Sequence, residues 1–179
     1  MAIAIASRYA RALADVVSRT GEYRPALDDL QAFAAVYRQS AELRDVLRTP
    51  AVALADKERI LEALLARLGP SVTVANFFRV LLANYRLPAL DDIIEAFAKI
   101  ANERMGIAQV RIASAADLSE DQRRTLVARF ETITHKRAEV EFEVDAQLLG
   151  GITAQIGSTI YDGSVRGHLE RIRERLTAR

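Results

Sequence analysis

The chain has 179 residues, half of them hydrophobic, and its 25 lysines and arginines against 24 acidic residues leave a formal net charge of +1. This balance holds on both sides of Gly106 and argues against a nucleic-acid surface as the main function. The lack of cysteine excludes disulfides and cysteine-ligated metal centres. No apolar run is long enough to span a bilayer, and the first residues lack a signal peptide's continuous apolar segment. We therefore expect a soluble, intracellular protein without direct membrane insertion.

Six helices are predicted before Gly106, because apolar residues recur at helical spacing between glycine and proline breaks. We place them at residues 2–19, 25–39, 40–49, 56–68, 71–85 and 88–105. Short loops between helices are typical of an all-α bundle.

The first predicted helix has more apolar width than one helix contact requires, roughly 200° on a helical wheel. One edge of this arc consists of Ile5, Tyr9, Ala12 and Val16, and the other of Ala6, Ala10, Leu13 and Val17. Arg8, Arg11 and Asp15 are expected to face water.

The fifth predicted helix, residues 71–85, is the most apolar run in the chain. Its bulky face, which we expect in the core, consists of Val74, Phe77, Phe78, Leu81, Leu82 and Tyr85. The opposite face carries only one charge and consists of Val72, Asn76, Arg79, Val80 and Ala83. Two interpretations stay open: the helix is central and covered on all sides, or its second face is a shallow groove for a helix of another protein.

After Gly106 the pattern changes to strands, with apolar alternation at 108–112, 138–145 and 152–156. Ser119 and Gln122 predict a capping box at the start of a helix whose apolar residues are Leu126, Val127, Phe130 and Ile133. A last helix follows Asp162-Gly163-Ser164, with a buried stripe of Val165, Leu169, Ile172 and Leu176. We expect the first two strands to be parallel and the third to form a hairpin with the second. The predicted fold is mainly α: a six-helix bundle at 1–105, then a small α+β domain of order β-α-β-β-α at 106–179.

A catalytic site is not indicated. Asp162, Ser164 and His168 invite a triad interpretation, but Asp and Ser are ordinary caps at a helix start. His135 has no partner at metal-ligand spacing, so both histidines are expected in surface or capping roles. Gly150-Gly151 begins no phosphate-binding motif. We predict no catalytic residue, cofactor or metal, and favour an interaction protein.

Three ordered segments together resemble the δ subunit family of F-type ATP synthase, which includes the mitochondrial oligomycin-sensitivity-conferring protein. They are Arg8-Tyr9-Ala10-Arg11-Ala12-Leu13; Asn76-Phe77-Phe78-Arg79-Val80-Leu81 with Arg86 and Leu90-Asp91-Asp92-Ile93; and Leu149-Gly150-Gly151-Ile152 with Gly157 and Asp162-Gly163-Ser164-Val165-Arg166. The resemblance covers nearly the whole chain, and the third segment is the most specific. Ala138 and Ala154 stand where the family commonly has larger aliphatic residues.

This resemblance implies a non-catalytic stator subunit, present once per complex, peripheral at the cytoplasmic face of the bacterial inner membrane. The N-terminal bundle would receive the N-terminal helix of an α subunit in a groove between the first and fifth helices. We assign to that groove Ile5, Tyr9, Ala12, Val16, Val72, Asn76, Arg79, Val80 and Ala83. The C-terminal domain would meet the C-terminal helices of the b subunits through Gly150, Asp162, Ser164, Arg166 and Leu169.

Two other functions are weighed against the stator. A helical RNA-binding or antitermination module would bind with a steep salt dependence, and the balanced charge argues against it. A small hydrolase using Ser164 would need a general base and a pocket that the sequence does not indicate.

Overall fold

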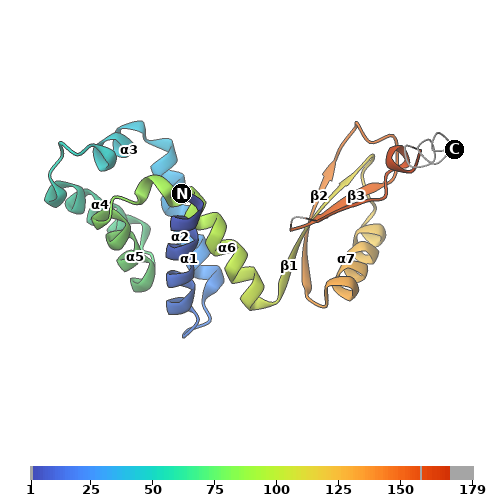
Figure 1. Ribbon diagram of the computed structural model, residues 1–179, viewed down its shortest axis with the longest axis horizontal. Coiled ribbons are helices and arrows are strands. Elements are labelled where there is room, and N and C mark those ends of the chain that lie inside the picture. Colours follow the sequence, from blue (N-terminus) through green and yellow to red (C-terminus); the bar gives the residue numbers. More distant parts are fainter. Residues whose placement is uncertain (1, 158, 170–179) are drawn as a thin grey trace. The chain divides into compact units, whose positions relative to one another are not determined.

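The computed structural model describes residues 2–157 and 159–169, with the side chains of 2 and 3 left out (Figure 1). Its chain divides into two compact units, Met1–Ala101 and Asn102–Arg179. The first unit is helical, and the second holds a small sheet with a helix along one face (Figure 1). The prediction of a mainly helical chain with a small α+β part is confirmed.

The described residues before the sheet form six α-helices and one turn of 3-10 helix. They are α1 Ala2–Val17, α2 Tyr23–Gln39, α3 Ala41–Arg48, α4 Leu54–Leu68, α5 Val72–Ala83, η1 Leu87–Ala89 and α6 Leu90–Met105. Local chemistry sets their ends: Ser71 Oγ accepts the Val74 N–H at 3.4 Å and caps α5, and Gly69 ends α4 in the left-handed conformation.

Aromatic packing centres the first unit on α2 and α5. The rings of Phe33 and Phe78 stack with centroids 4.0 Å apart, and both side chains are fully buried. Ile93 and Phe97 bring the buried side of α6 into the core. The bulky face of α5 lies in this core as predicted, with one exception.

Tyr85 was expected in the core, and that expectation is wrong, because 61% of the residue is exposed. The helix ends at Ala83, and Tyr85 itself takes a left-handed backbone conformation with φ of 55°. The chain therefore turns away from the α5 axis before the Tyr85 side chain can reach the buried face. Its ring instead lies 5.4 Å from Nζ of the buried Lys57.

The described residues of the second unit include four strands, the helix α7 and the first residues of a last helix. The strands and α7 are β1 Ile107–Ser114, α7 Glu120–Thr134, β2 Arg137–Val144, β3 Ile152–Ile156 and β4 Thr159–Asp162, and the sheet order is β2-β1-β3-β4. The strands β1 and β2 are parallel, as predicted. Residues 165–169 are helical, whereas the predicted continuation of this helix with Ile172 and Leu176 lies outside the described residues.

Two predictions for the sheet are wrong. The strand β3 pairs antiparallel with β1, not with β2. Seven residues, 145–151, join β2 to β3; this is longer than a tight hairpin loop, so the chain can pass over β1. Pairing with β1 sets Ala154 opposite Ile112 and buries both. The strand β4 was not predicted, because its four exposed residues carry no burial pattern.

The helix α7 covers one face of the sheet, where Val110, Ile112, Phe130 and Ala154 form a buried cluster. The predicted capping box is confirmed: Ser119 Oγ accepts the Gln122 N–H, and Gln122 Oε1 accepts the Ser119 N–H. Ile133, expected on the apolar face of α7, is 59% exposed because it lies in the last turn.

Candidate functional site

The helices α1 and α5 contact each other, and the ring of Tyr9 meets the ring edge of Phe77 at a centroid distance of 6.5 Å. Tyr9 and Ile5 are half-buried. This contact leaves apolar side chains of both helices uncovered. Val16 is 52% exposed, Val72 77% and Val80 47%, and Ala12 and Ala83 are also exposed. These five residues are called the α1–α5 surface below.

The exposure of the α1–α5 surface excludes one of the two interpretations of α5. A central helix covered on all sides would not expose Val72, Val80 and Ala83. Apolar side chains that gather on a surface mark sites where another molecule binds. Of the nine residues assigned to a groove, none is fully buried in this chain.

The polar residues Asn76 and Arg79 of α5 are held by a hydrogen-bond network. Arg79 donates to both carboxylate oxygens of Glu62 on α4, at 2.6 and 2.8 Å, and to Asn76 Oδ1 at 2.7 Å. The hydrogen bond from Arg79 lowers the pKa of Glu62, and the same bond raises the pKa of Arg79. The network fixes a polar border beside the exposed valines of α5.

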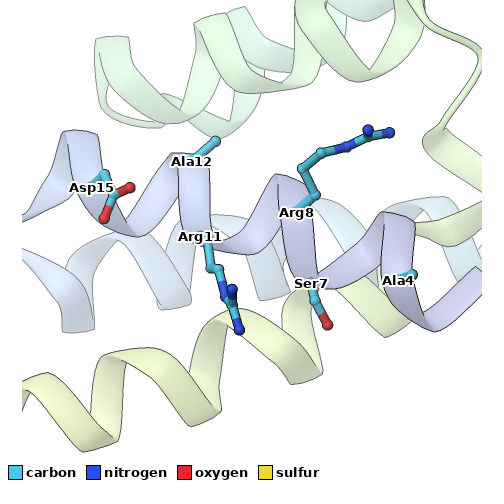
Figure 2. A pocket seen from close by; sticks show the side chains of 6 residues that line it. All are labelled: Ala4, Ser7, Arg8, Arg11, Ala12 and Asp15. Carbon is cyan, nitrogen blue, oxygen red and sulfur yellow. The ribbon is translucent and has the colours of Figure 1, made fainter.

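The outer side of α1 carries a hollow of about 390 Å³. It is lined by Ala4, Ser7, Arg8, Arg11, Ala12 and Asp15 (Figure 2). Figure 2 shows Arg8 and Arg11 directed to opposite sides of the helix, which leaves short side chains between them. Short side chains allow a second helix to approach the backbone of α1 closely. Ala4 and Ser7 were not among the predicted residues, although the row of small residues could have indicated them.

In the second unit, the predicted contact residues Gly150, Asp162 and Ser164 lie together at the start of the last helix. Ser164 is buried, and its N–H donates to Asp162 Oδ1 at 2.8 Å. The Gly150 carbonyl accepts the Val165 N–H at 2.9 Å. Ser164 Oγ accepts the Gly167 N–H at 3.0 Å. Asp162 and Ser164 therefore cap the helix, which is the role that the sequence predicted for them.

The two described residues of the apolar stripe predicted for the last helix are not buried. Val165 is 47% exposed and Leu169 is 55% exposed, and the preceding loop exposes 78% of Leu149. Arg166 is also exposed. The prediction that Val165 and Leu169 are buried is therefore wrong. Leu149 and Val165 were not assigned to the contact, although the pattern of the predicted stripe pointed to Val165.

Within the described parts of the chain, no His, Cys, Asp and Glu side chains form a group of three that could hold a metal ion. The same residues include no helix with the length and apolarity needed to cross a membrane. His135 ends α7 in the left-handed conformation, which is the capping role expected for it.

Comparison with known proteins places the whole chain in one family. A model of the family described as ATP synthase delta (OSCP) subunit matches residues 5–176. The chain belongs to this family. The ATP synthase subunit delta of Acidobacterium capsulatum is 39% identical, over 98% of this chain and 99% of the relative. The ATP synthase subunit delta of Myxococcus xanthus is also 39% identical, over 99% and 98% of the two chains.

A solved structure shares the fold of this delta-family chain. A chain of the Toxoplasma gondii mitochondrial ATP synthase hexamer matches with a TM-score of 0.70 and 21% identity, over 97% of this chain and 98% of the other. Membership in the delta family makes the protein a non-catalytic subunit of F-type ATP synthase, with a role in the stator and peripheral stalk. The RNA-binding and hydrolase alternatives are thereby set aside.

Proposed function

We propose that this delta-family subunit ties the catalytic head of ATP synthase to the peripheral stalk, so that the head resists the torque of the rotor. The N-terminal helix of an α subunit binds the α1–α5 surface, and the C-terminal helices of the b subunits bind the second unit. One copy serves each complex, peripheral at the cytoplasmic face of the bacterial inner membrane. The observation that carries this proposal is the exposure of Val16, Val72 and Val80 on two helices that contact each other.

The chemistry of the α1–α5 surface suits a helix as its partner. Exposed valines supply apolar area, and the alanines Ala12 and Ala83 let a third backbone come close. An amphipathic helix that lies on the α1–α5 surface would bury one apolar stripe and leave its polar side in water. The Arg79–Glu62–Asn76 network supplies a polar rim for that occupant.

The contact between the α-subunit helix and the α1–α5 surface must withstand the torque of the rotor, and this requires a high affinity. A well-packed contact that buries roughly 800 Å² on each partner is compatible with nanomolar binding, about 12 kcal/mol. An occupant held this tightly would dissociate slowly compared with turnover of the rotor. We therefore expect apolar burial to dominate this contact, with the polar rim fixing the register of the partner helix.

The second contact is supported by Leu149, Val165 and Leu169, which are exposed where the last helix begins. Apolar side chains of this size at a helix start would be covered by a helix end from the stalk. The two contacts lie in different compact units. Separate units for the two partners agree with a connecting role.

The proposal is tested by titrating the full chain with a peptide that copies the N-terminal helix of the α subunit of the same complex. Val80→Asp and Ala12→Asp each place a charge on the α1–α5 surface, and each should weaken binding while the chain still folds. Ile133→Asp is the matched control, because Ile133 is exposed on α7 in the other unit. Undiminished binding in both surface variants would remove the groove from the account.

A further inference from the structure

Two glycine-containing segments of the second unit meet backbone to backbone. One segment, 150–152, leads into β3, and the other, 162–167, leads from β4 into the last helix. The Gly163 N–H donates to the Ile152 carbonyl at 3.0 Å, and the Val165 N–H donates to the Gly150 carbonyl at 2.9 Å. These bonds join the entry of β3 to the first turn of the last helix.

The crossing of the two segments leaves no room for a side chain at Gly151. A Cβ there would overlap the Gly163 carbonyl oxygen and lie 3.0 Å from Cα of Ser164. A Cβ at Gly163 would in turn lie 3.2 Å from the Ile152 carbonyl oxygen. The neighbouring atoms are backbone, so a side chain at 151 would require the two hydrogen-bonded segments to shift relative to each other.

A second close approach lies one turn further along. A Cβ at Gly167 would overlap the carboxylate of Asp162 and lie 2.8 Å from its Cγ. That carboxylate accepts the Ser164 N–H and so caps the helix. A side chain at 167 would push the cap away, although alanine is otherwise the better residue inside a helix.

We propose that Gly150, Gly151, Asp162, Gly163, Ser164 and Gly167 form an interlock that positions the first turn of the last helix against β3. The interlock presents Val165 and Leu169 as one surface with Leu149, and this inference rests on the proposed function, in which that surface meets the b subunits. The role of the glycines is to let the two segments approach more closely than a Cβ would allow. A surface that is already fixed in the free protein loses less conformational entropy when its partner binds. It also keeps its orientation when rotor torque acts on the contact.

The chain supplies a matched control for this proposal. Gly157 has a φ of +59°, comparable with +81° at Gly151, but a Cβ at Gly157 would meet nothing within 4 Å. Gly157→Ala therefore imposes similar backbone strain without the overlap. Gly167→Ala tests the overlap alone, because no left-handed φ is involved there.

The experiment measures amide hydrogen exchange by NMR and the affinity for a purified soluble domain of the b subunits, for wild type and the variants G151A, G167A and G157A. The first two variants should speed exchange at Gly163 and Val165 by at least about tenfold and weaken stalk binding by a similar factor. Exchange at Val110 and Ile112 in the sheet should not change. G157A should match wild type in binding to within about threefold.

The exchange rates and the stalk affinities together test whether the interlock positions the last helix. Unchanged exchange at Gly163 and Val165 in G151A would overturn the interlock, and so would faster exchange with undiminished stalk affinity. Equal losses in G157A and G151A would assign the effect to backbone strain and also overturn it. If wild type fails to bind the stalk domain, the proposed function fails, whereas the exchange data still decide whether the glycines position the helix.

Discussion

Truncating Val72 to alanine tests how much the α1–α5 surface contributes to binding. The substitution removes two methyl carbons from a residue that is 77% exposed in the free chain. At about 0.8 kcal/mol per buried carbon, covering that area contributes roughly 1.2 kcal/mol, or about eightfold in affinity. Val16 and Val80, at 52% and 47% exposure, should each contribute roughly 0.8 kcal/mol, or about fourfold.

The assay is isothermal titration calorimetry of the full chain with the peptide copying the α-subunit helix. We expect the losses to follow the exposed fractions, with Val72→Ala largest and the triple variant weaker by roughly 100-fold. The free energy of unfolding should hardly change, because alanine is a good helix former at exposed positions. Ile133→Ala, in the other unit, should bind like wild type. A triple variant that binds with wild-type affinity would show that these valines do not contact the peptide.

Three further predictions concern the fold. Phe78→Ala should destabilise the N-terminal unit by about 3–5 kcal/mol in urea unfolding, since a fully buried ring stacked on Phe33 is lost. Ser119→Ala should cost about 1 kcal/mol and speed exchange in the first turn of α7, where the capping box is lost. In an NMR titration the pKa of the Glu62 carboxyl should be lowered, and Arg79→Gln should return it toward the ordinary Glu value. Because the pKa is lowered in the folded state, the Glu62–Arg79 pair stabilises the fold above the ordinary Glu pKa. This stabilisation is lost as the pH falls through the lowered pKa.

Local sequence signals were sufficient for the helices. The pair Gly69-Pro70 and the cap Ser71 place the break between α4 and α5, and Ser119 with Gln122 places the start of α7. These signals work because capping and proline chemistry act over only a few residues. The position of Tyr85 was not predicted, because Tyr85 follows the C-cap of α5 in a left-handed conformation that usually selects glycine.

The arrangement of the sheet was harder to predict. Alternation along 152–156 identifies a strand and its buried face, but it does not say which neighbour supplies the hydrogen bonds. That choice depends on the length of the loop 145–151 and on the free edge of β1, and both are properties of the assembled sheet. The strand β4 has no inward apolar face and hence no pattern to detect.

The candidate site was anticipated to different degrees in the two units. Surplus apolar width on the first and fifth helices could be counted from the sequence, and exposed Val16, Val72 and Val80 agree with it. The identity of the partner could not be predicted in this way, because the apolar width of a helix indicates that its face is covered but not which molecule covers it. The close approach of Asp162 to Gly167, which leaves no space for a Cβ at position 167, could not be predicted from the sequence either, because it arises only in the folded backbone.

The most direct test of the central claim is to map the bound peptide on the protein by methyl and amide NMR. We expect shifts concentrated at Ala12, Val16, Val72, Val80 and Ala83 when the α-subunit peptide is added, with α3 and the second unit unaffected. Saturable binding whose shifts lie elsewhere and leave these five residues unchanged would contradict the central claim.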